Sequence, residues 1–366
     1  MKDAFMINKL QSVLKAFGLE PAAYTIEEFG SGLINNTWKI QSRTAGTGFI
    51  LQRINHQVFK QPDHIADNIQ TIASWLREQA PEYLFIAPLP APQGHTMHYD
   101  SEAGYFRIFP FIANSFSIDT VSAPQQAYEA ARQFGLFTKL LAGIDIQALK
   151  ITLPDFHNLS LRYRQFETAL NSGNKQRMAE SAALIEFLQE QQAIVATYES
   201  IKRDPAFHIR VTHHDTKISN VLFDARGKGL CVIDLDTVMP GYFISDVGDM
   251  MRTYLSPVSE EEADFSKISI REDIFQAIVN GYLGEMGQEL TAPEKAHFVY
   301  AGKFMIYMQA LRFLTDYLQN DQYYKPRYEK HNLVRAGNQV VLLQKLMEKE
   351  NELSRFVQQR VQVGIQ

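Results

Sequence analysis

The stretch that decides the fold of this chain is His213-His214-Asp215-Thr216-Lys217-Ile218-Ser219-Asn220, together with Asp234 downstream of it. The stretch is polar, and apolar segments typical of strands precede and follow it. Residues 221–233 contain two such segments around a turn and therefore predict a β-hairpin that leads to Asp234. A hairpin returns its second end beside its first, so we expect Asn220 and Asp234 to lie together, with Asp215 nearby.

These residue types are the ones that phosphoryl transfer requires. One aspartate accepts or orients the proton of the attacking hydroxyl, and a second aspartate and an asparagine hold Mg²⁺ against the phosphate oxygens. The spacing H-x-D-x-x-x-x-N supplies the base, Asp215, and one metal ligand, Asn220, while Asp234 supplies the other ligand. The alternative is an Asp- and Asn-rich turn without chemistry, but the flanking strands and the Ile233-Asp234 pair favour a catalytic site.

Lys217 lies two residues after the predicted base, and two interpretations of it stay open. In a kinase, a lysine here would reach the transferred phosphate and offset its charge. A solvated loop lysine is the other interpretation. We include Lys217 with Asp215 among the candidate catalytic residues.

A second loop, Gly30-Ser31-Gly32, lies between segments 24–29 and 37–41, which are typical of strands. The glycine pattern G-x-G-x-x-G is incomplete because its last position is Asn35. A strand follows where a dinucleotide-binding fold would have a helix, so the loop is predicted to be a β-turn-β cover over phosphates. An ordinary hairpin turn is the alternative, but a predicted helix and a hinge downstream favour the phosphate cover.

Composition limits the classes of protein that this chain can be. Its 366 residues are long for a single core, so two packed units are expected. The net charge of −5 argues against a general nucleic-acid binder. A single cysteine, Cys231, excludes an intrachain disulfide framework and a multi-cysteine zinc site. Neither a signal peptide nor a membrane span is evident, so we expect a cytoplasmic protein without a membrane partner; the oligomeric state is not predicted.

The order of predicted elements divides the chain near Phe111–Ser115. Before this point, three strands, a helix and a hairpin follow one another; after it, long helical patterns dominate. The clearest helical patterns cover 124–141, 179–201, 271–286 and 292–318. We therefore predict an α+β protein with a small sheet-rich N-lobe, 1–112, and a larger helical C-lobe, 113–366, with the site in the cleft.

Long runs of this sequence resemble the aminoglycoside/choline-kinase-type phosphotransferase superfamily, and more closely the bacterial N-acetylhexosamine 1-kinases. The matching segments are GSGLINNT (30–37), FILQRIN (49–55), RVTHHDTK (210–217), VIDLDTVMPG (232–241), RFLTDYL (312–318), Tyr323 and HNLVR (331–335). They lie in the same order across most of the chain. The resemblance implies a protein-kinase-like bilobal fold.

It also implies a reaction: transfer of the γ-phosphate of ATP to the anomeric hydroxyl of N-acetylglucosamine or N-acetylgalactosamine, with Mg²⁺ bound. The residues implied for substrate are Asp215, Thr216, Arg312, Asp316 and Tyr323. The residues implied for the nucleotide are Gly30, Ser31, Gly32, Asn35, Arg53, Phe111 and Ala113, the last two through the hinge main chain. In this superfamily Asp246 would open a helix as its N-cap and brace the catalytic loop.

The sequence departs from the superfamily pattern in the predicted N-lobe. The strand expected to carry a phosphate-pairing lysine contains Gln52 and Arg53, so either Gln52 fills that position or Arg53 replaces the lysine. The helix expected to supply a glutamate offers Asp67 or Asn68 instead. Leu33 occupies a loop position where we expect histidine in the best-known relatives. Charge neutralisation would then fall on the metal and the backbone.

Two other functions stay open at the level of sequence. One is a kinase for another small alcohol, such as choline, homoserine or an aminoglycoside. The other is a nucleotide-binding module without catalysis, which the absence of the lysine motivates. Such a module has no need for an intact Asp215, Asn220 and Asp234, so the enzyme is favoured.

Overall fold

The computed structural model describes residues 2–30, 32, 34–44 and 46–362. Contacts divide the chain into two compact units. The first comprises the chain up to Phe116 with two later segments, Gln147–Leu153 and Ile233–Met239. The second comprises Ser117–Ile146, Pro154–Val232 and the chain from Pro240 onward. The predicted functional division at 112/113 stays a prediction.

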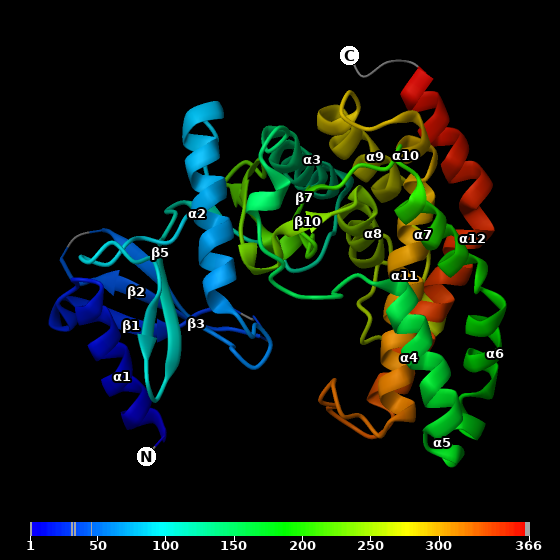
Figure 1. The fold of residues 1–366 in the computed structure, drawn as a ribbon, viewed down its shortest axis with the longest axis horizontal. Helices are drawn as coiled ribbons and strands as arrows, with labels where there is room; N and C mark the ends of the chain where they lie inside the picture. The colour runs from blue at the N-terminus through cyan, green and yellow to red at the C-terminus, as the bar shows by residue number, and fades with distance from the viewer. Residues whose placement is uncertain (1, 31, 33, 45, 363–366) are drawn as a thin grey trace. The chain divides into compact units, whose positions relative to one another are not determined.

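The first unit contains a five-stranded antiparallel sheet in the order β1-β2-β3-β5-β4 (Figure 1). Its strands are β1 (Tyr24–Glu28), β2 (Asn36–Ser42), β3 (Gly48–Ile54), β4 (His98–Asp100) and β5 (Gly104–Pro110). The unit also holds α1 (Lys2–Ala16), η1 (Pro21–Ala23), α2 (Pro62–Gln79), β6 (Ser115–Phe116) and η4 (Leu235–Thr237). Three strands, a helix and a hairpin therefore follow one another as the sequence predicts.

Helix α1 covers one face of this sheet. Its apolar residues recur at helical spacing, so Leu10, Val13 and Leu14 lie on one stripe and are buried. That stripe packs against sheet residues such as Leu51 and Phe106. The helix ends shortly before Gly18, whose φ of 76° is the left-handed conformation that glycine adopts without strain.

Helix α2 anchors the two later segments of the first unit through Asn68, which is 1% exposed. The Asn68 amide nitrogen donates to the main-chain oxygens of Lys150 (2.8 Å) and Val238 (3.0 Å). Its oxygen accepts from the Lys150 N–H at 2.7 Å. Each bond satisfies a main-chain group. Asn68, at a helix position where a glutamate was expected, therefore holds the main chain of the two later segments.

The second unit is mainly helical. Its helices are α3 (Pro124–Leu140), α4 (Leu159–Ser172), α5 (Lys175–Glu180), α6 (Ala182–Glu190), α7 (Ala193–Arg203), α8 (Phe243–Tyr254), α9 (Glu272–Met286), α10 (Ala292–Ala296), α11 (Phe298–Leu318) and α12 (His331–Gln362). Its strands and short 3₁₀ helices are β7 (Arg210–Thr212), η3 (Ile218–Asn220), β8 (Val221–Asp224), β9 (Gly229–Val232), β10 (Met239–Gly241) and η5 (Phe265–Lys267).

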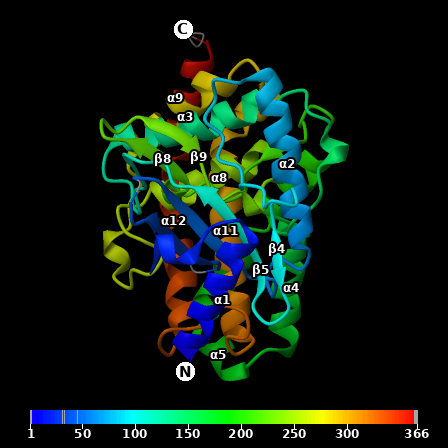
Figure 2. The ribbon, with the colours of Figure 1, turned by 90° about the vertical axis from the view of Figure 1, so that its left-hand side faces the viewer.

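Helix α11 forms the centre of the second unit. Almost all of its residues are buried, as is typical of a helix that is apolar on every side. It packs against α12, α8 and α4, and α3 packs along α9; Figures 1 and 2 show the α3–α9 pair side by side. Among the described residues, no helix is both long enough and apolar enough to cross a bilayer.

Two predicted helices are each interrupted. The helix predicted over 179–201 is wrong as a single element, because α6 ends at Glu190 and α7 begins at Ala193. The helix predicted over 292–318 is likewise two elements, α10 and α11. A capping box starts α10: the Thr291 hydroxyl accepts from the Glu294 N–H (3.2 Å), and the Glu294 carboxylate accepts from the Thr291 N–H (2.8 Å).

Candidate active site

The predicted catalytic loop connects strand β7 to the β8–β9 hairpin of the second unit. The hairpin pairs Val221 with Val232 and Leu222 with Cys231. Asn220 therefore directly precedes its first paired residue, and Asp234 follows its last paired residue by two positions. The predicted hairpin is confirmed.

Carboxylates from helix α8 hold the main chain of the loop. Asp246 accepts from the N–H groups of His213 (3.0 Å) and His214 (2.7 Å). Asp249 accepts from the N–H of Thr216 at 2.9 Å. These bonds fix a tight turn in which His214 has a φ of 66°, in the left-handed region that non-glycine residues rarely occupy. The main chain of the loop is thus preorganised by two carboxylates of helix α8 rather than by side chains of the loop itself.

Asp246 braces the loop as expected, but the predicted N-cap role is wrong. Helix α8 begins at Phe243 with Tyr242 as its N-cap, so Asp246 lies inside the first turn. Its side chain is fully buried. Burial raises the pKa of Asp246 to about 7, against the opposing effect of the two main-chain donors.

Thr216 was expected to contact substrate. In the structure, its hydroxyl and its carbonyl both form hydrogen bonds with helix α8. Its hydroxyl donates to the main-chain oxygen of Asp246 (2.7 Å), and its own carbonyl accepts from the Tyr254 hydroxyl (2.6 Å). The residue is fully buried. This geometry favours a positioning role, and the contact of Thr216 with substrate stays a prediction.

His213, the first residue of the motif, is a buried core residue. Its ring lies edge-on to Phe134 of α3, with 5.1 Å between ring centroids, and it is 0% exposed. Its Nδ1 accepts from the Asp215 N–H at 3.4 Å. The histidine therefore anchors the loop to α3 next to the predicted base.

Three further polar residues of the loop, Asp215, Lys217 and Asn220, lie close together. Lys217 Nζ lies 3.0 Å from Asp215 Oδ1, and the Asn220 amide nitrogen donates to Asp215 Oδ2 at 3.1 Å and to its main-chain oxygen at 2.8 Å. Burial is the largest single influence and would raise the pKa of Asp215, but the charge and hydrogen bond of Lys217, together with the charges of His213 and Arg252, outweigh it, so this pKa lies below the usual range. Asp215 is therefore an anionic hydrogen-bond acceptor at neutral pH, as a base or orienting group must be.

The residues predicted to hold Mg²⁺ fit a divalent cation by their donor chemistry. The Asn220 amide nitrogen is committed to Asp215, which leaves the amide oxygen as the atom that a hard cation requires. Asp234 offers carboxylate oxygens from a backbone with a φ of 59°. Within the described ranges, no cluster of three His, Cys, Asp or Glu side chains could bind a metal. Amide and carboxylate oxygens are the ligands that a hard cation prefers, so each residue suits Mg²⁺ by its own chemistry, and their binding of one shared ion stays a prediction.

A cluster in the second unit surrounds Arg312 of helix α11. The guanidinium carbon lies 5.9 Å from the ring centroid of Phe156, 5.9 Å from that of Tyr323 and 5.5 Å from that of Tyr324. We call these four residues the Arg312 cluster. No Asp or Glu among the described residues pairs with Arg312, whose Nη1 donates to Gln309 Oε1 at 3.4 Å. The cluster thus presents an uncompensated cation between aromatic rings.

Ring contacts connect the Arg312 cluster to the catalytic loop. Phe156 stacks on His157 with 4.4 Å between centroids, and His157 lies 5.3 Å from the ring of His214, which precedes Asp215. Burial, with the positive charges of His214 and Arg312, holds the pKa of His157 well below its usual range. The imidazole is therefore neutral, and the loop and the arginine belong to one region of the second unit.

Asp316 and Tyr323 have different positions relative to this region. Asp316 is 4% exposed, and its two carboxylate oxygens accept from the N–H groups of Tyr323 (2.7 Å) and Tyr324 (2.8 Å). The Asn332 amide nitrogen also donates to it at 3.0 Å. Asp316 thus holds the loop that carries both tyrosines, while the Tyr323 side chain is mostly exposed. Contacts of either residue with substrate stay predictions.

The predicted nucleotide residues belong to the first unit. Gly30 has a φ of 82°, which suits a glycine, whereas Ser31 and Leu33 lie outside the described residues. The side chain of Asn35 donates to Asp236 Oδ2 at 2.7 Å and accepts from the Asn55 N–H at 3.0 Å. The end of the glycine loop is therefore bonded to the segment that follows Asp234.

The structure separates the two candidates for the missing lysine. Gln52 faces Thr37 of β2 and Arg107 of β5 in the sheet register. Arg53 is the next residue, so its side chain lies on the opposite face, in register with the buried Phe106. This alternation favours Gln52 for the lysine position, and nucleotide contact by Arg53 stays a prediction.

The predicted hinge begins where β5 ends. The Phe111 N–H already donates to the main-chain oxygen of Gly48 at 3.0 Å. The Phe111 ring lies 6.2 Å from that of Phe29, and Lys39 Nζ lies 4.2 Å from its centroid. Adenine binding would therefore use other main-chain groups of this segment, such as those of the exposed Ala113.

Sequence analysis missed Arg107, Asp236, Phe156 and Tyr324. Arg107 is a lone charge in the apolar run Tyr105–Phe111, and a charge in such a run indicates a buried ion pair. Asp236 was passed over as a neighbour of the predicted metal ligand. The two aromatic residues carry no pattern that separates them from core residues.

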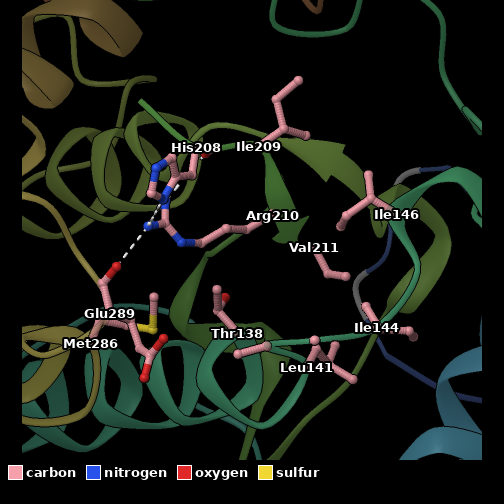
Figure 3. A pocket seen from close by; sticks show the side chains of 12 residues that line it. Thr138, Leu141, Ile144, Ile146, His208, Ile209, Arg210, Val211, Met286 and Glu289 are labelled. Atoms are coloured by element: carbon pink, nitrogen blue, oxygen red, sulfur yellow. Dashed lines mark hydrogen bonds between the residues drawn. The ribbon is translucent and has the colours of Figure 1, made fainter. Parts of the chain in front are cut away.

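A pocket of about 310 Å³ in the second unit contains none of the predicted site residues (Figure 3). Mostly apolar side chains line it, among them Leu141, Ile144 and Val211. Its arginine, Arg210, is already bonded to the main-chain oxygen of Glu289 (2.8 Å) and to the Glu294 carboxylate (2.6 Å). We therefore do not assign this pocket to the reaction.

An antiparallel sheet unit, a helical unit and a preorganised H-x-D-x-x-x-x-N loop define the class of this protein as a kinase-like phosphotransferase. The model of one family, described as the phosphotransferase enzyme family APH, matches residues 25–267. That match covers more than half of the chain, so the protein belongs to this family. It is accordingly an enzyme, a small-molecule kinase with an alcohol group as acceptor.

Solved structures agree on the fold. An aminoglycoside phosphotransferase from Alicyclobacillus acidocaldarius is similar with a TM-score of 0.62 at 11% identity, over 93% of this chain and 95% of that chain. An amicoumacin kinase crystallised with AMP-PNP and Ca²⁺ has a TM-score of 0.60 at 13% identity, over 92% of each chain. A choline kinase from Cryptosporidium parvum has a TM-score of 0.58 at 12% identity, over 97% and 99%. The predicted protein-kinase-like fold is confirmed.

Proposed function

We propose that this kinase transfers the γ-phosphate of ATP to the anomeric C1 hydroxyl of N-acetylhexosamines and yields the sugar 1-phosphate. The observation that carries the proposal is the Arg312 cluster: an arginine that pairs with no carboxylate of the described residues, surrounded by aromatic rings, in the same region as the catalytic loop. The sequence resemblance to N-acetylhexosamine 1-kinases supports it.

The charge of the cluster argues against a cationic acceptor. Arg162 lies in the same region, because its pKa is lowered by burial and by the charge of Arg312. Its guanidinium donates to the main-chain oxygen of Asp155 (2.9 Å) and to Gln165 Oε1 (3.0 Å), neither of which is charged. The positive charges of Arg312 and Arg162 repel an ammonium group, and the Asp155 carboxylate offsets only the charge of Arg162. Choline and aminoglycosides are therefore less suitable acceptors than a neutral sugar.

A 2-acetamido sugar matches what the cluster offers. A guanidinium presents five N–H donors in a plane, which suits the acetamido oxygen and ring hydroxyls. Aromatic side chains combine a large apolar surface with a polar tip and can cover a sugar ring while remaining hydrated. Arg312 and Tyr323 are therefore the residues that we assign to the sugar, with Tyr324 and Phe156 as further walls.

We assign the chemistry to the catalytic loop. Asp215 accepts the hydrogen bond of the C1 hydroxyl and takes its proton as the oxygen attacks the γ-phosphorus; the bond from that phosphorus to the bridging oxygen breaks, and ADP leaves. Lys217, 3.0 Å from Asp215, offsets charge on the transferred group. Asn220 and Asp234 would hold Mg²⁺, which neutralises charge on the phosphate oxygens. Gly30, Ser31, Gly32, Asn35 and the hinge main chain are the proposed nucleotide contacts.

Phosphorus NMR of the reaction with ATP and Mg²⁺ tests this function. N-acetylglucosamine and N-acetylgalactosamine should give an anomeric phosphate resonance and ADP. Their methyl glycosides, in which the C1 oxygen is blocked, should give no new resonance; they are the matched control for the position of transfer. Turnover of the methyl glycosides would show that another hydroxyl is phosphorylated.

The same assay compares the proposal with its main alternative. Choline, homoserine and an aminoglycoside, each supplied at the concentration of the sugars, should consume little ATP. Turnover of one of them without turnover of either sugar would contradict the sugar assignment and leave the kinase assignment intact. A protein that binds ATP but phosphorylates none of these acceptors would favour a non-catalytic module.

A further inference from the structure

Arg107, on strand β5, is a fully buried cation of the first unit, with 1% of its surface exposed. Its Nη2 lies 2.5 Å from Asp236 Oδ1. Its Nε and Nη2 donate to Gln52 Oε1 at 3.1 and 2.8 Å. Gln52 in turn donates to the Thr37 hydroxyl at 3.4 Å, so a row of polar side chains crosses three adjacent strands. The guanidinium therefore connects the sheet to the segment after Asp234.

Asp236 joins this row to the glycine loop. Its Oδ1 faces Arg107 and its Oδ2 accepts from Asn35 at 2.7 Å, while Asn35 also accepts from the Asn55 N–H. Asp236 is 2% exposed and is one of the three residues of η4, which Asp234 precedes. The segment with the proposed metal ligand and the loop with the proposed phosphate contacts are thus held by one carboxylate.

The burial of Arg107 favours a role in positioning other residues over direct binding of a ligand. Its Nη1 has no hydrogen-bond partner among the described residues and is inaccessible to solvent. A phosphate oxygen could reach it only if its neighbours moved apart. Nη2, by contrast, contacts the carboxylate that lies two residues after Asp234. The geometry therefore favours an effect through Asp236 rather than on the ligand itself.

We propose that Arg107 is the positioning residue that fixes the metal carboxylate Asp234, through its ion pair with Asp236. Arg107 also donates to Gln52, the residue that the sheet register favours for the expected lysine position. The inference rests on the proposed function for the identity of the metal ligand, and it does not depend on the acceptor. Mutation of residues that hold a metal ligand in place typically weakens metal binding about 10–100-fold.

The test is the affinity of Mn²⁺, measured by electron paramagnetic resonance, for the protein saturated with AMP-PNP. Arg107→Lys keeps the charge and loses the planar fork that bonds Gln52 and Asp236 together. Asp236→Asn keeps the shape and loses the ion pair. Each should weaken Mn²⁺ binding about 10–100-fold, the usual cost of removing a partner behind a metal ligand. Binding of ADP without metal, measured by calorimetry, should change much less.

Two further variants calibrate the measurement. Asp234→Asn removes the proposed ligand itself and should weaken Mn²⁺ at least as much as either positioning variant. Lys9→Met removes an ion pair with Asp100 (3.2 Å) in the same unit, at residues without any proposed ligand contact, and should leave Mn²⁺ affinity unchanged. Circular dichroism and thermal unfolding show whether each variant is folded.

The outcomes separate the inference from the proposed function. Unchanged Mn²⁺ affinity in a folded Arg107→Lys or Asp236→Asn protein, with Asp234→Asn weakened, overturns the positioning role. Unchanged affinity in Asp234→Asn overturns the metal assignment on which it rests. A loss in the positioning variants without any sugar 1-phosphate in the NMR assay supports the positioning role and rejects only the acceptor. Should Arg107→Lys fail to fold, the Asp236→Asn arm decides.

Discussion

The catalytic loop of the second unit and a row of polar side chains in the first unit hold buried carboxylates in different ways. We call this row, which consists of Asn35, Thr37, Gln52, Arg107 and Asp236, the Arg107 row. In the loop, Asp246 and Asp249 accept from main-chain N–H groups of three residues that are close in sequence. In the row, Asp236 is bound by the side chains of Arg107 and Asn35, which lie far from it in the chain. In the first arrangement the carboxylates bind main-chain groups, and in the second the carboxylate binds side chains.

This difference makes the two regions sensitive to different substitutions. Loop geometry should survive changes to loop side chains and fail when a supporting carboxylate or a close packing contact is altered. The ion pair of the Arg107 row joins two side chains, so it should fail when either side chain changes. A buried ion pair that loses one partner leaves an uncompensated charge, which is costly.

The largest expected effect is on catalysis, from Asp215→Asn. Asparagine keeps the shape of the side chain but cannot accept the proton, so kcat should fall about 10²–10⁴-fold. The free energy of unfolding should change little, because Asp246 and Asp249 hold the loop main chain independently of this side chain. Steady-state kinetics measure the change in kcat, and chemical denaturation measures the change in the free energy of unfolding. Asp119→Asn, at an exposed position, is the matched control.

Retention of turnover in Asp215→Asn would contradict the assignment of the base. A large loss of stability in the same variant would instead show that the loop is not held by its main chain alone. The second result would weaken the comparison between the two regions.

The next effect concerns pH and Asp246, whose pKa is raised to about 7 because burial outweighs its two main-chain donors. The folded protein then binds the proton more tightly than the unfolded chain does. Stability from this group is therefore fully present at low pH and is lost as the pH rises from about 4 to about 7. Asp246→Asn cannot titrate, so its free energy of unfolding should fall less over this window, by up to about 4 kcal/mol.

Urea denaturation at a series of pH values measures this slope. Parallel pH profiles for wild type and Asp246→Asn would show that the carboxylate remains ionised in the folded state. The Asp119→Asn control should reproduce the wild-type profile. Because the pKa of Asp249 is also raised by burial, some pH dependence should remain in the variant.

The same contrast explains what the sequence could and could not predict. The order of elements and the hairpin up to Val232 depend on short-range patterns and could be inferred from spacing alone, whereas the roles of Asp215 and Asn220 stay predictions. The protein-kinase-like fold followed from the resemblance. Arg107 and Asp236 are 129 positions apart by their numbers and meet only in the folded first unit. No local pattern could pair them.

Errors at the level of elements have a similar cause. The apolar pattern over 179–201 predicted one helix, where the chain has the end of α5, the whole of α6 and most of α7. Asp246 looked like a helix cap because aspartate favours that position, yet its partners are the N–H groups of a distant loop. Tertiary contacts, rather than propensity, decided both cases.

A smaller effect is expected at the Arg312 cluster, which also depends on tertiary contacts. Arg312→Lys keeps the positive charge but replaces the planar fork by a single ammonium. Loss of hydrogen bonds to a charged donor costs about 1.5–3 kcal/mol, so kcat/KM for the sugar should fall about 10–100-fold. The KM for ATP should not change. Initial rates with each substrate varied in turn provide the measurement.

Arg164→Lys, on an exposed part of α4, is the control for the chemical change. An equal loss for ATP and sugar would place Arg312 outside the acceptor region. Arg312→Lys should not improve turnover of choline, because the positive charge is retained. Arg312→Met removes that charge and should improve it.

The smallest effect is on packing beside the catalytic loop. A side chain at Gly241 would collide with the His214 imidazole and the Thr212 hydroxyl, both of them buried, whereas an added Cβ at Gly284 meets nothing within 4 Å. Gly241→Ala should therefore lower the free energy of unfolding by about 1–2 kcal/mol through overpacking. Gly284→Ala, inside α9, should raise it by about 0.5–1 kcal/mol because glycine is a poor helix former.

The two alanine variants differ only in their surroundings, so their opposite signs test the loop's support directly. Gly241→Ala should also lower kcat, since the collision displaces His214 next to Asp215, and Gly284→Ala should leave kcat unchanged. Thermal unfolding and initial rates check both. Equal stability of the two proteins would mean that His214 and Thr212 can move aside, and the loop would then be held less rigidly than its hydrogen bonds to Asp246 and Asp249 indicate.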